Sequence, residues 1–349
     1  MKSGRTAFVA AAALCSLFLT NSANAADDGR FLVVGKAATP NPTQAAQRIG
    51  EFAERVSPGS SMLAAGAVIA LAFQMPQIDF SSPINATVYL DKNAVSGDEP
   101  IALAVAASPS GGKAVSKVRF GKSVFPAKSI DGKLLATESK RLLEETALLP
   151  TPLKSNSTLA AEFFPSAFLA NSKGGLGAFA AYLAKIVLGK KTAPKFDNNR
   201  FDSLEKILSQ TSSVLVEADA DTAKMLVSIS ATPKSGTPLA MALAMKKGDM
   251  SEAELVALGK KLSGDKTLDV NKEITDVVAF LLKQSAKIQN NDFAFFAKLA
   301  KDLCDVKTSS DGKKLHIAIS ASPERFKKTL DIIRPHSTDK KTKRQRISF

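Results

Sequence analysis

The stretch FLVVGKAATP, residues 31–40, sets our expectation of the fold. It begins as an apolar run typical of a buried strand and ends in Thr39-Pro40, a pair that favours a helix start. A Ser or Thr hydroxyl accepts from free N–H groups there, and proline has its φ already set for helix. The same ending recurs at residues 107–109, 231–233 and 321–323. The repetition predicts four strand-to-helix corners.

A Pro-rich, polar segment at residues 150–155 divides the chain into an N-terminal half, 26–150, and a C-terminal half, 155–335. In the first half we expect strands at 31–34, 84–90, 101–107, 117–120 and 123–135, with helices at 43–56, 61–73 and 138–148. In the second half we expect strands at 159–164, 214–218, 224–230, 306 and 315–320, with helices at 165–188, 203–209, 238–245, 251–262, 272–289, 292–303 and 324–333.

Tight turns such as Asp131-Gly132 join most of these strands, which favours antiparallel pairing. The predicted fold class is α+β. We expect two pseudo-repeats, each a curved antiparallel sheet packed on helices.

The first 25 residues indicate export. Lys2 and Arg5 precede an apolar core at residues 8–19, and Ala23-Asn24-Ala25 matches a small-x-small cleavage pattern. We therefore predict a signal peptide, residues 1–25, cleaved after Ala25. The alternative is an N-terminal anchor, but a membrane span needs about 20 apolar residues, and no later stretch reaches that length either.

The mature chain keeps one cysteine, Cys304, so it forms no internal disulfide. An exported chain without disulfides fits the periplasm or cell surface of a bacterium. The net charge of +14 favours contact with an anionic envelope surface or lipid. Nucleic acid is excluded as a partner, because the chain is exported and has no Trp and two Tyr for base stacking.

The sequence offers no credible catalytic, metal or cofactor site. Only His316 and His336 are present, and neither has a Cys, His or carboxylate at metal-ligand spacing. A Ser-His-Asp triad could use only His316, because His336 lies in a basic tail at residues 336–349 that we expect to be disordered.

Weaker motifs also occur. Short matches to the S-x-x-K and K-S/T-G motifs of Ser-Lys hydrolases occur at Ser110 with Lys113, at Ser203 with Lys206, and at Lys234-Ser235-Gly236. The structural setting that these enzymes need is not indicated around any of them. Gly175 and Gly177 resemble half of a dinucleotide fingerprint. The carboxylate pairs Glu144-Glu145 and Asp219/Asp221 fall on a helix and a hairpin tip, where they either diverge or are solvated.

Phenylalanine is unusually frequent, with 20 residues in the chain. Core packing explains most of them. The alternative is a cavity for a lipid or acyl chain, lined by residues of the second half: Phe163, Phe164, Phe168, Phe179, Phe293, Phe295 and Phe296. Basic residues of the tail could contact an anionic surface: Lys340, Lys341, Lys343, Arg344 and Arg346.

These observations favour an exported, non-enzymatic cell-envelope protein with a structural or binding role. The first alternative is a periplasmic carrier of an apolar ligand, and the second is a Ser-Lys hydrolase. The hydrolase hypothesis requires Ser110, Lys113 and Lys234 to meet in one cleft.

Overall fold

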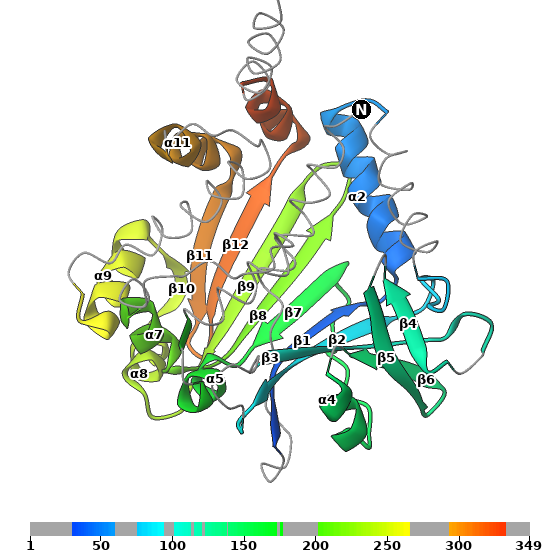
Figure 1. The fold of residues 1–349 in the computed structure, drawn as a ribbon. Coiled ribbons are helices and arrows are strands. Elements are labelled where there is room, and N and C mark those ends of the chain that lie inside the picture. The colour runs from blue at the N-terminus through cyan, green and yellow to red at the C-terminus, as the bar shows by residue number, and fades with distance from the viewer. Residues whose placement is uncertain are drawn as a thin grey trace, which may run out of the picture.

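The computed structural model describes residues 30–59, 75–93, 101–112, 115–120, 123–137, 139–172, 175–176, 202–265 and 293–332. In this part of the chain the α+β prediction is confirmed, because helices surround a twelve-stranded antiparallel sheet (Figure 1). The predicted signal peptide, the basic tail, the predicted helices at 61–73 and 272–289, and residues 177–188 of the predicted helix at 165–188 lie outside the described residues.

The sheet is continuous from one half of the chain to the other. The first half contributes β1 (Phe31–Thr39), β2 (Ile84–Asp91), β3 (Ile101–Ala107), β4 (Lys117–Phe120), β5 (Ser123–Ile130) and β6 (Lys133–Thr137). The second half contributes β7 (Leu159–Phe163), β8 (Thr211–Ala220), β9 (Met225–Pro233), β10 (Lys247–Met250), β11 (Asp305–Asp311) and β12 (Leu315–Ala321). The spatial order is β10-β11-β12-β9-β8-β7-β1-β2-β3-β6-β5-β4.

The expectation of one sheet in each half is therefore wrong, because residues 35–38 of β1 pair with residues 160–163 of β7 and merge the two sheets. Read outward from this central pair, the order is the same on both sides. β1 is followed by β2, β3, β6, β5 and β4, and β7 is followed by β8, β9, β12, β11 and β10.

Most predicted helices are present where the structure describes the chain. The helices are α2 (Pro42–Val56), α4 (Lys140–Glu145), α5 (Pro165–Asn171), α7 (Asp202–Leu208), α8 (Pro238–Ala244), α9 (Glu252–Ser263), α11 (Phe293–Leu303) and one over residues 323–332. α4 is shorter than predicted and ends at Glu145. The short strand β10 was not predicted, since KGDM has neither alternation nor strand-forming residues.

The four predicted corners differ from one another. Only the fourth runs directly from strand to helix, with the Arg325 N–H donating to Ser322 Oγ at 3.4 Å. At the first, Asn41 caps α2 instead of Thr39. At the second, a short 3-10 turn (Ser110–Gly112) follows. At the third, β9 runs through Pro233.

The N-terminal half buries apolar residues on both faces of its sheet. On one face Leu90 and Val34 pack with Phe168 of α5, and Phe168 is fully buried. On the other face Tyr89 and Leu135 pack against α4. The pKa of Tyr89 is raised by this burial. These clusters form a core that encloses the first half from both sides.

A separate cluster joins the two ends of the described chain. Phe52 of α2 and Phe326 of the helix at 323–332 meet edge to face, with ring centroids 5.3 Å apart. Both helices cover the end of the β8–β9 hairpin at Ala220 and Met225. Among the described helices, none has the length and apolar character needed to cross a bilayer.

Candidate functional site

The second half of the sheet carries polar side chains on one face. Residues paired across antiparallel strands project from the same face. The register from β10 to β1 gives one row of mostly polar residues: Asp249, Ser309, His316, Ser230, Leu215, Glu162 and Lys36. The next row along the strands reads Lys307, Ala318, Ser228, Glu217, Ala160 and Ala38. We call this surface the polar face.

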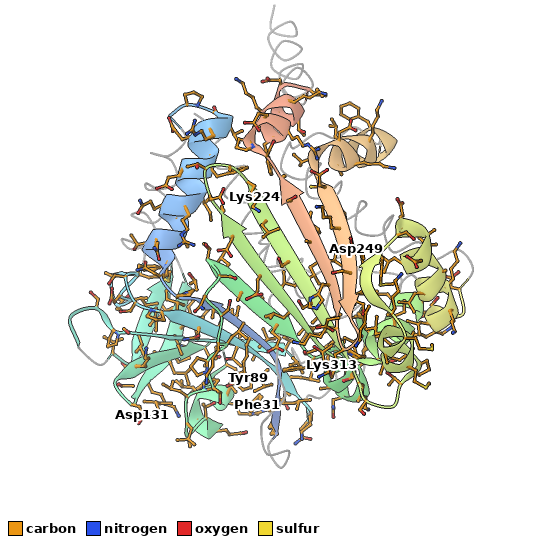
Figure 2. All side chains as sticks on the ribbon, turned by 180° about the vertical axis from the view of Figure 1, so that it is seen from behind. Phe31, Tyr89, Asp131, Lys224, Asp249 and Lys313 are labelled. Carbon is orange, nitrogen blue, oxygen red and sulfur yellow. The ribbon has the colours of Figure 1, made fainter. Side chains whose placement is uncertain are left out.

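The opposite surface of the same strands carries branched aliphatic side chains, and we call it the aliphatic face: Val214, Val216, Val227, Ile229, Val306, Ile317 and Ile319. β9 is only partly buried along its whole length, and Val306 is 43% exposed. No described helix crosses the middle of β9 and β12 in Figure 1 or in Figure 2, where Asp249 of the polar face is labelled. The alternation is typical of an antiparallel sheet with one solvated face.

Three polar side chains on the polar face form a hydrogen-bonded line. Ser230 Oγ lies 3.0 Å from Nδ1 of His316, and Nε2 of His316 lies 3.2 Å from Oδ2 of Asp311. A neutral imidazole with its proton on Nε2 satisfies both contacts, since it accepts from the Ser230 hydroxyl and donates to the Asp311 carboxylate. His316 and Asp311 are 39% and 51% exposed, so this line is open to solvent.

The β11–β12 hairpin fixes the carboxylate at the end of this line. Oδ1 of Asp311 accepts hydrogen bonds from the N–H groups of Lys313, at 2.8 Å, and of Lys314, at 2.6 Å. These two bonds, followed by the one from His316, lower the pKa of Asp311 to about 2. Asp311 is therefore an anion at neutral pH, held by the turn while its second oxygen faces the imidazole.

The line has the residue types of a Ser-His-Asp triad but differs from one in two ways. In serine hydrolases the serine contacts Nε2 and the acid contacts Nδ1, whereas here the nitrogens are exchanged. Ser230 also lies in the interior of β9, which pairs with β8 on one side and β12 on the other. The ladder hydrogen bonds occupy the backbone N–H groups there, so an oxyanion hole of the usual kind has no donors among them.

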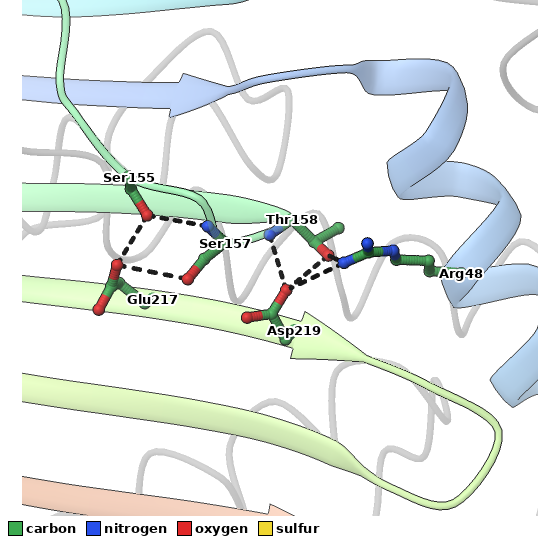
Figure 3. A network of polar contacts seen from close by, with 6 residues as sticks. All are labelled: Arg48, Ser155, Ser157, Thr158, Glu217 and Asp219. Carbon is green, nitrogen blue, oxygen red and sulfur yellow. Dashed lines mark hydrogen bonds and ion pairs between the residues drawn. The ribbon is translucent and has the colours of Figure 1, made fainter.

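A second polar network lies at the edge of the same face (Figure 3). Glu217 of β8 accepts from the hydroxyls of Ser155, at 2.7 Å, and Ser157, at 3.3 Å. Both serines belong to the segment that links the two halves of the chain. The network therefore attaches this linker to β8.

The same network reaches α2 through Asp219. Its Oδ1 atom accepts from both the N–H and the hydroxyl of Thr158, each at 2.7 Å. Arg48 donates to the Thr158 hydroxyl at 3.3 Å and lies 3.7 Å from Asp219 Oδ1 (Figure 3). Thr158 is 7% exposed, so its hydroxyl depends on these partners. The arrangement joins three segments and has no feature of a reactive centre.

The predicted phenylalanine lining is divided among several places. Phe163 and Phe168 meet with ring centroids 6.0 Å apart, and Phe168 lies in the core of the first half. Phe164, the residue after Phe163, is also buried. Phe295 is partly buried on α11, which lies at the opposite end of the sheet from α5 in Figure 1. Phe179, the side chains of Phe293 and Phe296, and the basic tail residues lie outside what the structure describes. The hypothesis of a shared lining stays a prediction.

The Ser-Lys arrangement required by the hydrolase hypothesis is wrong for Ser110 and Lys234. Ser110 follows β3 and Lys234 follows β9, with β2, β1, β7 and β8 between them in the sheet. Since neighbouring strands are antiparallel and about 4.8 Å apart, the five spacings separate the two residues by about 24 Å across the sheet, and the residues also lie at opposite ends of the strands. Ser203 instead donates to Asp265 at 2.7 Å. Lys113 is outside the described residues.

The other motifs have ordinary structural roles. Next to Gly175, the N–H of Leu176 donates to the Glu205 carboxylate at 2.6 Å. This N–H is therefore already used within the protein and does not bind a cofactor phosphate in this structure. Asp221 accepts from the N–H groups of the hairpin tip, which lower its pKa. The described residues contain no group of three potential metal ligands. Burial raises the pKa of the Cys304 thiol to about 11, which makes this thiol a poor nucleophile.

The sequence limits a Ser-His-Asp triad to His316 but identifies no serine or carboxylate partner for it. The partners come from the strand register, which places Ser230 directly across from His316 and brings the turn residue Asp311 back to it. Comparisons with protein families, curated proteins and solved structures found no match to this chain. Its function is therefore inferred from its residues.

Proposed function

We propose that this protein is an exported component of a bacterial cell envelope that acts by binding and not by catalytic turnover. The observation that supports the proposal is the difference between the faces of the sheet. The first half is packed on both sides, whereas β9 in the second half is only partly buried along its whole length. Sequence features alone support export, through the signal peptide and its cleavage pattern.

The charge of the polar face favours a neutral or cationic polar partner. Its carboxylates are more numerous than its lysines, although the whole chain is basic. The carboxylates are Asp249, Asp311, Asp305, Glu217, Asp219 and Glu162, and the lysines are Lys36, Lys247 and Lys307. Arg48 and Arg325 pair with Asp219 and Asp305, and the remaining carboxylates still outnumber the lysines. The face therefore offers little attraction to an anionic polymer, and the predicted contact of the tail with an anionic surface would use another part of the chain.

Co-sedimentation with isolated envelope fractions tests this function. The protein should pellet with its own envelope, and Ser228→Lys on the polar face should weaken binding about tenfold, or ~1.4 kcal/mol. Thr222→Lys, at the exposed tip of the β8–β9 hairpin, adds the same charge away from the face and should bind like wild type. Failure to pellet, or equal loss in both variants, contradicts the proposal.

Export is tested separately. N-terminal sequencing of the exported protein should show Ala26 as the first residue of the mature chain.

A second candidate, a carrier of an apolar ligand, is favoured by the aliphatic face. Its residue Val306 is 43% exposed, while Val216 and Ile317 on the same face are 7% and 9% exposed, so an apolar ligand would reach this face at Val306. Native mass spectrometry of protein purified from its own envelope should then show a bound lipid. Val306→Asp should abolish that species, while Val124→Asp in β5, where valine is 53% exposed, should retain it. The absence of lipid from wild-type protein would end this candidate.

We also propose that the two halves are diverged pseudo-repeats, each forming a curved part of the sheet. The matching strand order on either side of the β1–β7 pair supports this. The halves differ mainly between β10 and β11, where α9 and α11 occur, whereas β4 and β5 are separated by two residues. Coexpression of the two halves, divided at the exposed Lys154, should give a soluble one-to-one complex. Two insoluble fragments would argue against independent repeats.

A further inference from the structure

We propose that Ser230 is a nucleophilic serine that can be acylated, with His316 as its general base and Asp311 as the positioning residue for His316. This goes beyond the proposed binding function, because it assigns a covalent modification site on the polar face. The evidence is the continuous line from the Ser230 hydroxyl through the imidazole to an anchored carboxylate.

The chemical step uses an activated acyl ester or thioester as donor. Ser230 Oγ forms a bond to the carbonyl carbon while its proton moves to Nδ1 of His316. The bond from that carbon to the leaving group then breaks, and the leaving group takes the proton from Nδ1. The products are an acyl-serine and the free alcohol or thiol. The imidazole ends neutral, as it began, and no oxidant or cofactor takes part.

The site is accessible to such a donor. Ser230 is partly buried, and its neighbours along β9 on the same face include the small Ser228. His316 is flanked on the other side by Ser309, also small. Because the nearby strand N–H groups are used in the ladder, the oxyanion gains little stabilisation in acylation or in hydrolysis. A donor with a good leaving group can still acylate Ser230 slowly, whereas the serine ester that forms has a poorer leaving group and is hydrolysed more slowly still. The expected outcome is stoichiometric acylation with little turnover.

A fluorophosphonate and p-nitrophenyl acetate, each incubated with the full chain, test the proposal. Intact-mass measurement should show one adduct, and peptide mapping should place it on Ser230. Ser230→Ala should lose the adduct. Ser129→Ala, which removes an exposed strand hydroxyl from β5 in the first half of the sheet, should react like wild type. No adduct on wild type, or an adduct elsewhere that persists in Ser230→Ala, overturns the proposal.

Two further variants test the roles of the partners. His316→Ala should slow labelling about 100-fold, a typical effect of losing a general base, and added imidazole should restore part of the rate. Asp311→Asn keeps an oxygen for the turn N–H groups but cannot accept from Nε2, so labelling should slow while the thermal midpoint changes little. Undiminished labelling of His316→Ala would refute the assignment. Labelling of Ser230 and binding to the envelope are separate measurements, so a loss of binding in Ser228→Lys neither supports nor contradicts the assignment of Ser230.

Discussion

The two halves of the sheet share a strand order but bury their residues differently. In the first half, Leu90 and Leu135 are 2% and 1% exposed on opposite faces, and each packs in a cluster with a helix, α5 or α4. In the second half, β9 is only partly buried throughout, and its two faces separate into polar and aliphatic surfaces. The comparison indicates that the first half of the sheet is closed on both faces, whereas β9 in the second half leaves side chains accessible to partners.

Truncation of core residues should give the largest difference in stability between the two halves. Leu90→Ala should lower the free energy of unfolding by about 2–5 kcal/mol, because it leaves a cavity in a closed core. Ile229→Ala on β9 should lower it by about 1–2 kcal/mol, because part of that side chain already contacts solvent. Denaturant unfolding of both variants measures the difference. Equal losses would contradict the assigned roles of the two halves.

The ion pair at the start of β1 gives the first half a pH-dependent contribution. Arg30 Nε and Nη2 lie 2.8 and 2.7 Å from the two carboxylate oxygens of Asp91, the last residue of β2. Burial opposes ionisation of Asp91, but hydrogen bonds from Arg30 and from the Asn93 N–H, with the charges of Arg30 and Arg141, outweigh it and lower its pKa.

Replacing Asp91 should therefore weaken the protein at neutral pH and change its acid response. Asp91→Asn should cost about 1–3 kcal/mol at pH 7. A lowered native pKa means that the unfolded chain binds the proton first, so the contribution is complete above about pH 5 and is lost as acid titrates the native carboxyl, below about pH 4. Unfolding curves of wild type and variant should converge in acid. A constant difference at all pH values would exclude this ion pair as its cause.

The linker network predicts a smaller effect at the join between the halves. Thr158→Ala removes a buried hydroxyl that donates to Asp219 and accepts from Arg48, and should cost about 1–2 kcal/mol. Thr158→Ser keeps the hydroxyl and should recover most of that loss. Thermal or denaturant unfolding provides the measurement. A Ser variant as unstable as the Ala variant would assign the effect to the methyl group instead.

The smallest effect is expected in α9, which has no counterpart in the first half. Ser251 and Glu254 form a capping box, in which the Glu254 N–H donates to Ser251 Oγ and the Ser251 N–H donates to Glu254. Ser251→Ala should cost about 1 kcal/mol, and Ser251→Asp should retain most of the stability. Hydrogen exchange should show the loss confined to α9. Faster exchange throughout the sheet would show that α9 supports the second half as a whole.

Local signals in the sequence predicted most of the elements. The Asp131-Gly132 turn, the Ser251 cap and the alternation at 84–90 each act over a few residues, and all three features are present. The joining of two sheets into one was missed, because pairing of residues 35–38 with 160–163 depends on long-range contacts that no local pattern encodes.

The candidate site was missed for a related reason. His316 was recognised as the one histidine in a regular strand, but its partners come from a strand more than 80 residues earlier and from the turn before it. Once the register is known, the face and the neighbours of each side chain follow from the period of two. The Ser322 corner was predicted correctly, whereas at Thr39 the nearby Asn41 provides the cap instead.

The pairing of β1 with β7 has a mechanical consequence. This ladder covers residues 35–38 and 160–163, whereas β8 and β9 are paired from 211 to 220 and from 225 to 233. A tensile load that drew the two halves apart within the plane of the sheet would act on the shorter ladder first. The β1–β7 ladder, in which Lys36 pairs with Glu162, should therefore break before the longer β8–β9 hairpin unfolds.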